Sequence, residues 1–376
     1  MTRRRGAVIA GGGTGGHIVP SLQVARALVQ RGHPADTVEL YGSRRGQEAT
    51  VWPPLEFPYT LLPGRGIRRS VAPAALWANG GAVLGLAWAA LRAFGSFLVR
   101  RPRVVVVVGG YAGFAAGLAA VLTRVPLVLV TTDAVPGAVN GLLGRFAAAN
   151  AVAFAGTGLP RAHVTGTPVR PEMAALDRSV AGRAAARAEL GLPADRCLLA
   201  VFGGSLGARR INAAVAELEQ QWPQRDEVSV YHVAGRRDYD RFAASTRPAP
   251  DDDRAPYVVV PFEDRMPVLY TAADLFVCRA GAMTVAELVM AGMPAILVPL
   301  PGAPRDHQTR NAQALVAAGA AVVLPDAACD GDRLAAELNV LLGDTHALAR
   351  MGEAARSLAH PDAAARVAEL IDAHAR

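Results

Sequence analysis

Three glycine-rich turns carry the residue types with which this chain could do chemistry. They read GGGTGGH at 11–17, GGSLG at 203–207 and CRAGAMT at 278–284, and each follows a short apolar run. Glycine at a strand-to-helix turn lets the backbone approach a ligand closely, and N–H groups at the start of a helix form a ready-made phosphate site. The third turn leads into a helical pattern from Met283 to Ala291, so it predicts a site for a phosphorylated ligand.

Two ionisable side chains accompany these turns. Glu287 lies one helical turn beyond the third, where a carboxylate can reach the hydroxyl pair of a ribose. The competing interpretation is an ordinary βαβ unit with a solvated glutamate. His17 ends the first turn, and it is a candidate general base because an imidazole titrates near neutral pH. A purely structural histidine is the alternative there.

The chain shows no spacing typical of a metal site. Cys197, Cys278 and Cys329 are far apart, and the first two lie in or beside apolar runs, as buried thiols of a reducing cytosol would. The acidic run at 251–253 is flanked by prolines outside any strand pattern, which is typical of a solvated loop rather than a calcium cage. We therefore predict no metal.

Charge and length narrow the class of protein. A formal net charge of +7 over 376 residues favours an anionic partner, namely a nucleotide, a phospholipid surface or nucleic acid. Nucleic acid is the weakest of these, because no motif of a nucleic-acid module is present and aromatic residues are few. The apolar run after the N-terminal arginines is too short for a signal peptide, so we expect the protein on the cytoplasmic side.

Apolar runs that alternate with helical patterns predict an α/β fold in two domains. The expected strands lie at 7–10, 37–41, 103–108, 127–130, 151–154 and 163–165, then at 198–202, 228–233, 257–260, 274–277 and 295–298. The segment 165–173 has two prolines and no periodicity, so it reads as a linker. The second half restarts with a strand, a Gly-Gly turn and a helix. We therefore expect two doubly wound domains that face each other across a cleft.

The region 63–103 has a composition that suits either a core or a membrane surface. It begins with the basic loop GRGIRR at 64–69, continues through an apolar segment that includes Trp77 and Trp88, and ends in Arg100, Arg101 and Arg103. A membrane span is disfavoured because Arg92 and several glycines interrupt the segment. Two interpretations remain: a core helix with solvated arginines, or an interfacial patch on anionic lipid.

Taken together, the motifs resemble those of one family. GGGTGGHIVPSLQVARAL, FGGSLGARRIN and CRAGAMTVAELVMAGMPAILVPLP, in this order and spacing, are similar to the MurG family, which moves GlcNAc from UDP-GlcNAc onto an undecaprenyl-linked muramyl-pentapeptide lipid. The resemblance implies the GT-B fold of two Rossmann-like domains. Residues 1–165 would form the acceptor- and membrane-binding domain and 166–358 the UDP-GlcNAc-binding domain, with a C-terminal helix at about 360–376 crossing back to the first domain.

The resemblance also implies site residues. Those expected to bind the donor are Arg170, Gly203, Gly204, Ser205, Phe262, Glu263, Ala282, Met283, Thr284, Glu287, His307 and Gln308. Those expected to bind the acceptor are Thr14, Gly15, Gly16, His17, Gly110, Tyr111 and Asn140. Glu287 would hold the ribose hydroxyls, whereas the 262–263 segment would meet the uracil edge through backbone atoms. No cofactor or metal is expected, because a helix N-terminus and an arginine can stabilise the leaving UDP.

One loop departs from the family pattern. Many relatives carry His-Glu-Gln-Asn after the fifth strand, where this chain has Val-Thr-Thr-Asp at 130–133, while Gly137 and Asn140 stay in register. This departure puts acceptor recognition in question more than donor recognition. We hypothesise that Asp133 orients a catalytic His17 through the distal ring nitrogen. The alternatives are that Asp133 caps the next helix or binds the acceptor sugar.

The expected activity is inverting, metal-independent transfer of GlcNAc to the C4 hydroxyl of MurNAc-(pentapeptide)-pyrophosphoryl-undecaprenol, which converts lipid I to lipid II in peptidoglycan biosynthesis. The enzyme would lie peripherally on the cytoplasmic side of the cell membrane, with 64–103 on the anionic inner leaflet. Other cell-wall synthesis proteins are candidate partners, and nucleic acid is not. The alternatives are a GT-B transferase for a soluble acceptor, a UDP-sugar epimerase, an NAD-dependent oxidoreductase and a non-catalytic sugar-nucleotide binder. The oxidoreductase is disfavoured because Glu39 falls inside its strand.

Overall fold

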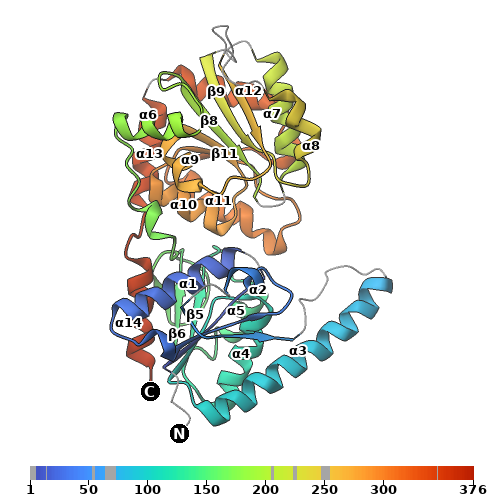
Figure 1. Cartoon of the computed structure of the whole chain (residues 1–376), viewed down its shortest axis with the longest axis vertical. Coiled ribbons are helices and arrows are strands. Elements are labelled where there is room, and N and C mark those ends of the chain that lie inside the picture. Colours follow the sequence, from blue (N-terminus) through green and yellow to red (C-terminus); the bar gives the residue numbers. More distant parts are fainter. Residues whose placement is uncertain are drawn as a thin grey trace. The chain divides into compact units, whose positions relative to one another are not determined.

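The computed structural model describes two compact units of this chain (Figure 1). The described residues are 6–13, 15–52, 56–63, 73–204, 207–222, 227–246, 255–344 and 346–376, with the backbone alone for 51 and 73–79. The N-terminal unit comprises 1–170 and 360–376, and the C-terminal unit comprises 171–359. The sequence placed the first boundary at 165, inside the same proline-containing linker.

The N-terminal unit is built on seven parallel strands in the order β3-β2-β1-β4-β5-β6-β7. They are β1 (Ala7–Ala10), β2 (Val38–Ser43), β3 (Tyr59–Leu62), β4 (Val104–Val107), β5 (Leu127–Thr131), β6 (Ala149–Val152) and β7 (Ala162–Val164). The sequence did not predict β3. The strand order reverses direction between β1 and β4, and the carboxyl ends of strands at such a reversal are where open α/β sheets bind ligands.

Helices cover both faces of this sheet. They are α1 (Gly15–Gln30), α2 (Glu48–Val51), α3 (Pro73–Arg100), α4 (Gly110–Thr123), α5 (Ala138–Leu143) and α14 (Ala363–His374). Successive residues of β1 point to opposite faces, as a pleated strand requires. Ala7 and Ile9 pack with α1 and α14, whereas Val8 and Ala10 pack with α3 and α4.

The last helix returns to the first domain, as the family resemblance implied. Val367, Ala368 and Ile371 of α14 are buried in the core on the α1 side of the sheet. Asp372 accepts hydrogen bonds of 2.7 Å from Arg31 Nε and from His33 Nε2 at the end of α1. Figure 1 shows α14 (red) beside α1 (blue). The N-terminal domain is therefore completed by residues from the far end of the chain.

The C-terminal unit has six parallel strands in the order β10-β9-β8-β11-β12-β13. They are β8 (Cys197–Phe202), β9 (Val228–Val233), β10 (Tyr257–Val260), β11 (Leu275–Cys278), β12 (Ala295–Leu297) and β13 (Ala321–Val323). Its helices are α6 (Val180–Glu189), α7 (Arg209–Gln221), α8 (Tyr239–Phe242), α9 (Met266–Ala272), α10 (Ala282–Ala291), α11 (His307–Ala317), α12 (Gly331–Gly343) and α13 (Ala347–Ser357). The reversal here lies between β8 and β11, so the turns after these two strands share one edge.

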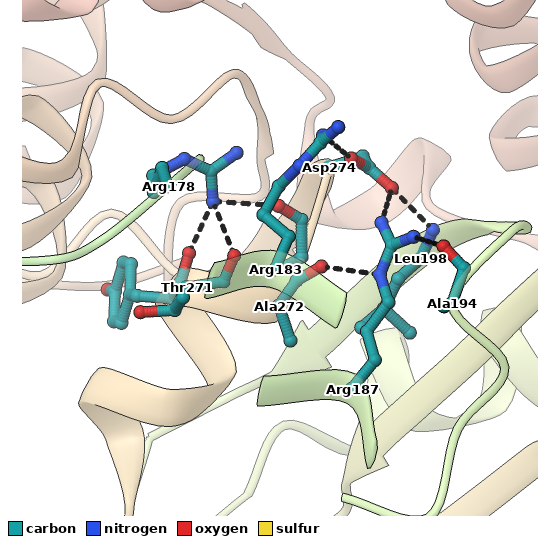
Figure 2. Close-up of polar contacts among 10 residues, drawn as sticks. Arg178, Arg183, Arg187, Ala194, Leu198, Thr271, Ala272 and Asp274 are labelled. Carbon is teal, nitrogen blue, oxygen red and sulfur yellow. Dashed lines mark hydrogen bonds and ion pairs between the residues drawn. The ribbon is translucent and has the colours of Figure 1, made fainter. Parts of the chain in front are cut away.

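A buried ion-pair cluster ties α6 to the sheet of the C-terminal unit (Figure 2). Asp274, just before β11, accepts from Arg187 Nη2 at 2.5 Å, from Arg183 Nη1 at 2.8 Å and from the Leu198 N–H of β8 at 2.8 Å. Arg187 also donates to the carbonyls of Ala272 and Ala194. Arg178 closes the end of α9 by donating to the carbonyls of residues 270, 271 and 273.

Replacing Asp274 should destabilise the protein strongly. The Arg187 side chain is only 6% exposed, so Asp274→Ala leaves a buried guanidinium without its carboxylate. Removing one partner of a buried pair costs about 3–5 kcal/mol. Urea denaturation followed by circular dichroism measures this loss. The control is Glu337→Ala, which removes the partner of the exposed Arg333 and should cost about 1 kcal/mol or less. Equal losses from the two variants would contradict the prediction.

Candidate functional site

His17 lies at the reversal point of the N-terminal sheet, in the first turn of α1. Its Nδ1 is 3.0 Å from the Gly12 carbonyl oxygen. Since a carbonyl can only accept, Nδ1 carries the proton in this arrangement and Nε2 is left as an acceptor. The Ser21 hydroxyl donates to the His17 carbonyl at 2.7 Å and holds the helix start. The half-buried ring is thus fixed in one tautomer.

The imidazole opens onto a pocket of about 200 Å³. The pocket is lined by His17, Val108, Gly109, Gly110, Thr131, Thr132, Asp133, Gly137, Ala138, Val139 and Asn140. A Cβ at Gly109, whose φ is 141°, would lie 2.7 Å from His17 Nε2. A glycine at this position therefore keeps space next to the nitrogen that can accept a proton.

The surroundings of His17 keep its ring neutral. Burial lowers the pKa of His17 below its ordinary value, because a charged imidazolium is poorly solvated there. The hydrogen bond to the Gly12 carbonyl and the negative charges of Asp133 and Glu48 raise the pKa, but they do not outweigh burial. At neutral pH the ring can therefore accept a proton, which is the requirement for a general base.

Asp133 lies in the same pocket as His17 and acts on it through its charge. The sequence hypothesis placed the Asp133 carboxylate on the distal ring nitrogen. In the structure this nitrogen, Nδ1, donates to the Gly12 carbonyl. A hydrogen bond from Nδ1 to Asp133 would therefore have to replace the one to Gly12. The dyad of His17 and Asp133 stays a prediction.

Asn140 presents an acceptor at the same pocket. Its Nδ2 donates to the Val130 carbonyl and to Thr131 Oγ1, both at 2.9 Å, so the amide is held firmly. Its Oδ1 is buried and has no hydrogen-bond partner among the described residues. Buried polar atoms are nearly always paired in native proteins, and an orphan at a pocket calls for a ligand donor. A hydroxyl or an N–H group of a substrate would satisfy it.

The other residues predicted for the acceptor side have mixed placements. Gly15 and Gly16 form the first turn of α1, and Gly110 begins α4 with φ of 76°. The Tyr111 hydroxyl donates to the Pro63 carbonyl at 2.6 Å, so it fixes the segment that leads into the basic loop. Thr14 lies outside the described residues.

In the C-terminal unit, two turns at the β8–β11 reversal offer backbone N–H groups. Helix α10 starts at Ala282, Met283 and Thr284, and no side chain caps this start. Uncapped N–H groups at a helix N-terminus favour an anion. Gly203 and Gly204 follow β8, with a φ of 92° at Gly204 that a side chain would disfavour, while Ser205 lies outside the described residues. The sequence-predicted phosphate turns thus lie on neighbouring strands.

Glu287 and Arg279 frame this edge. Glu287 is 7% exposed and its Oε2 accepts from the Tyr270 hydroxyl at 3.4 Å. Arg279 donates to the carbonyls of Val298 and Pro299 and to Asp326 Oδ1 at 2.6 Å. Arg279 therefore fixes the loops around the turn and does not need a ligand for its charge.

The segment predicted for the uracil edge is held by Glu263. Its carboxylate accepts from the Tyr231 hydroxyl at 2.6 Å and from the Arg265 N–H at 2.7 Å. Burial raises the pKa of Glu263, but the hydrogen bonds from Arg265 and Tyr231 prevail and hold it below its ordinary value. The half-exposed ring of Phe262 carries the Arg236 guanidinium 4.6 Å above its centre. Because the carboxylate is used internally, backbone atoms remain for recognition.

The residues predicted for the donor sugar lie at the start of α11. His307 Nδ1 bonds to the Pro304 carbonyl at 2.8 Å. Gln308 Oε1 accepts from the Leu300 N–H at 2.9 Å, which leaves its amide NH₂ group as a donor. Arg170, also predicted for the donor, belongs to the N-terminal unit rather than to the domain the sequence assigned.

Among the described residues no three His, Cys, Asp or Glu side chains are grouped as metal ligands, and the 251–253 run lies outside those residues.

Sequence reasoning missed Glu48, which is fully buried and accepts from the N–H groups of Gly13 and Ser43. Its signal was available: an acidic residue shortly after the second strand of a doubly wound domain faces the first glycine turn.

Helix α3 carries an apolar outer face. Its inner face, Ala82, Ala89, Ala93 and Phe97, is buried against the sheet side that also holds α4. Large apolar side chains at helical spacing point outward instead, and these are Leu84, Trp88, Leu91 and Leu98, each more than half exposed. The helix extends away from the domain body at its N-terminal end (Figure 1). By length and composition alone, Gly80–Arg100 is the one described helical stretch that could cross a membrane.

Comparison with known proteins covers both units. The glycosyltransferase family 28 N-terminal domain matches residues 7–152, and the glycosyltransferase family 28 C-terminal domain matches 198–367. A crystal structure of MurG from Acinetobacter baumannii superposes with a TM-score of 0.78 at 28% identity and covers 98% of this chain and 99% of that one. These matches confirm the GT-B fold class predicted from the sequence.

Curated relatives share one name. The relative from Alkalilimnicola ehrlichii is 42% identical over 98% of this chain and 99% of its own, and that from Desulforudis audaxviator is 37% identical over 97% of each. Both are named UDP-N-acetylglucosamine–N-acetylmuramyl-(pentapeptide) pyrophosphoryl-undecaprenol N-acetylglucosamine transferase. With the family 28 domains and the MurG structure, these similarities show that the chain belongs to the MurG family of glycosyltransferases.

Proposed function

We propose that this protein transfers GlcNAc from UDP-GlcNAc to the C4 hydroxyl of MurNAc in lipid I and so forms lipid II. The observation that carries the proposal is the placement of His17, whose Nδ1 bonds to the Gly12 carbonyl while its ring lines a pocket beside the reversal of the N-terminal sheet. It stands in a chain whose full-length relatives are named for this reaction. A soluble acceptor and a UDP-sugar epimerase are not favoured by these relatives.

The reaction assigns a separate task to each unit. In the N-terminal unit, His17 Nε2 accepts the proton of the attacking hydroxyl, and the hydroxyl oxygen forms the new bond to C1 of GlcNAc. The bond from C1 to the diphosphate breaks on the opposite face, so the sugar inverts and UDP leaves with the electron pair. In the C-terminal unit, the uncapped N–H groups of α10 stabilise the charge that develops on UDP, and Glu287 holds the ribose.

The loop at 130–133, whose sequence departs from the family pattern, bears on which acceptor the enzyme binds. Asp133 and Thr132 line the pocket together with Asn140. The buried Oδ1 of Asn140 has no hydrogen-bond donor among the described residues. A hydroxyl of the muramyl sugar supplies such a donor. The pocket is therefore suited to a sugar even though its sequence differs from that of many relatives.

Removing His17 should abolish most of the transfer. His17→Ala deletes the base, and general base catalysis is worth roughly 10²–10⁴ in rate, so we expect kcat to fall about 10³-fold with KM for UDP-GlcNAc unchanged. The assay follows radiolabel from UDP-GlcNAc into lipid I, and a donor-only reaction checks for an epimer. The control is His33→Ala, which removes a hydrogen bond to Asp372 of α14 just beyond the C-terminal end of α1, far from the pocket, and should leave kcat unaltered. Full activity in His17→Ala would overturn the assignment.

Stabilisation of UDP by α10 requires no metal ion. A helix N-terminus carries about half a positive charge, and here it lies beside the Gly203–Gly204 turn on the neighbouring strand. Transfer in excess EDTA should therefore stay within about two-fold of transfer with added Mg²⁺. A loss of activity in EDTA that Mg²⁺ restores would show that a metal carries part of this role.

The outer face of α3 suits peripheral binding to the inner leaflet. The inner face of α3 belongs to the domain core, so the helix cannot leave it to cross a bilayer without exposing that core. Leu84, Trp88 and Leu91 offer an apolar stripe, while the exposed Arg92 and Arg101 supply positive charge for anionic headgroups. The basic loop at 64–69 and Trp77, which the sequence also assigned to this surface, lie outside the described side chains. Other cell-wall synthesis proteins stay a prediction as partners.

Charges placed on the α3 face should weaken membrane binding. The double variant Leu84→Glu and Trp88→Glu removes two insertion points and adds repulsion from anionic lipid, so sedimentation with phosphatidylglycerol vesicles should fall at least tenfold. Val340→Glu on α12 is the matched control, because Val340 is 70% exposed in the C-terminal unit. Activity toward a short-chain, soluble analogue of lipid I should be retained by the double variant. Unchanged sedimentation would contradict the role of this face.

A further inference from the structure

A single peptide unit links the buried carboxylate of Glu48 to His17. The Gly13 N–H donates to Glu48 Oε2 at 2.8 Å. The Gly12 carbonyl accepts from His17 Nδ1 at 3.0 Å. These N–H and C=O groups belong to the same peptide bond, which joins Gly12 to Gly13. A continuous chain of hydrogen bonds therefore runs from a carboxylate, through one amide, to the ring nitrogen opposite the one that faces the pocket.

The surroundings of Glu48 fix this carboxylate in place. Its side chain is fully buried, and its other oxygen accepts from the Ser43 N–H at 2.6 Å at the end of β2. Gly12, Gly42 and Gly46 each turn a bare Cα toward it, and a Cβ at any of the three would collide with the Glu48 side chain. A buried carboxylate is costly unless it is hydrogen-bonded, so this cradle is a specific arrangement rather than an accident of packing.

We propose that Glu48 is a positioning residue for His17, acting through the Gly12–Gly13 peptide to fix the ring tautomer and to stabilise the imidazolium that forms during transfer. The inference rests on the proposed function of His17 as the base. Hydrogen bonds in series polarise one another, so negative charge at one end strengthens the acceptor at the other. A carboxylate bonded directly to the distal nitrogen plays this part in the Ser-His-Asp triad of hydrolases. Here an amide stands between the two groups.

Two carboxylates influence the His17 ring, and they approach from different elements. Asp133 follows β5 and lies in the pocket, whereas Glu48 lies at the start of α2 behind the glycine turn. Both negative charges raise the pKa of His17 against the lowering effect of burial. Glu48 also reaches Nδ1 through the two hydrogen bonds of the Gly12–Gly13 peptide. The two groups can therefore be distinguished by measurement. The charge of Asp133 should affect only the pKa of His17, whereas Glu48 should affect both its pKa and its tautomer.

The test is Glu48→Gln, which keeps the shape of the side chain and removes its charge. Nitrogen-15 NMR of histidine-labelled protein, with His17 assigned from a His17→Gln sample, reports both the pKa and the tautomer of this ring. In the wild type we expect the Nδ1–H form and a pKa below 6.5. In Glu48→Gln we expect a lower pKa, a detectable Nε2–H population and a kcat about 10–100-fold lower, with KM for UDP-GlcNAc unchanged.

Glu39→Gln is the matched control. Glu39 lies within β2 and, like Glu48, is a buried carboxylate; it is 1% exposed. It accepts a hydrogen bond from the Thr60 hydroxyl at 2.7 Å. Its loss should lower the melting temperature without altering the His17 resonances or kcat. If Glu48→Gln does not fold, Glu48→Asp takes its place, since it keeps the charge but draws the carboxylate back from Gly13. Its kcat should fall while the pKa of His17 stays near the wild-type value.

The outcomes separate the two claims. If Glu48→Gln leaves both the tautomer and the pKa of His17 unaltered, or if Glu48→Asp leaves the tautomer of His17 and kcat unaltered, Glu48 only braces the turn and the proposal is overturned. The NMR measurements need no substrate. A wild-type protein that shows the expected tautomer and shift yet transfers no GlcNAc to lipid I would refute the proposed function and not the linkage of Glu48 to His17.

Discussion

Parallel strand pairing is the constraint on which the rest of this structure depends. Parallel neighbours bring their carboxyl ends to one edge of a sheet, and a reversal in strand order leaves two of those ends with no crossover helix between them. In the N-terminal unit the reversal unites the turn of His17 with Gly109 and Gly110. In the C-terminal unit it unites the Gly203–Gly204 turn with the start of α10. Both candidate sites are therefore placed by the same topological rule.

Side-chain size decides what each face of α3 does. Alanines at 82, 89 and 93 let the helix lie close to its neighbours in the domain. The large side chains at 84, 88 and 91 lie on the opposite face and are exposed. An apolar helix of this length usually lies either in a protein core or in lipid. This one has one face in the core and one exposed apolar face, which is the arrangement that the proposed binding to a membrane surface requires.

Periodicity in the sequence was enough to predict most of the buried strands, the glycine motif predicted the second turn, and the family resemblance implied the return of the last helix. Periodicity failed at β3 and β13, because Tyr59–Leu62 is partly exposed and Ala321–Val323 is short, so neither stands out as an apolar run. The role of Glu48 was also missed, because it arises from backbone N–H groups that only the folded turn presents. His17 was predicted as the base from its type, its position and the family resemblance, but its tautomer depends on a carbonyl that no residue pattern encodes.

The return of α14 to the first domain has a consequence for synthesis. The ribosome makes this helix after the whole of the C-terminal unit, yet Val367 and Ile371 fill part of the N-terminal core. Domains otherwise tend to fold in the order in which they emerge. Here the first domain to emerge cannot close its core until the residues that follow the second domain have been made. A nascent chain therefore carries an apolar groove beside α1 throughout the translation of the second domain, and chaperones have that interval in which to bind it.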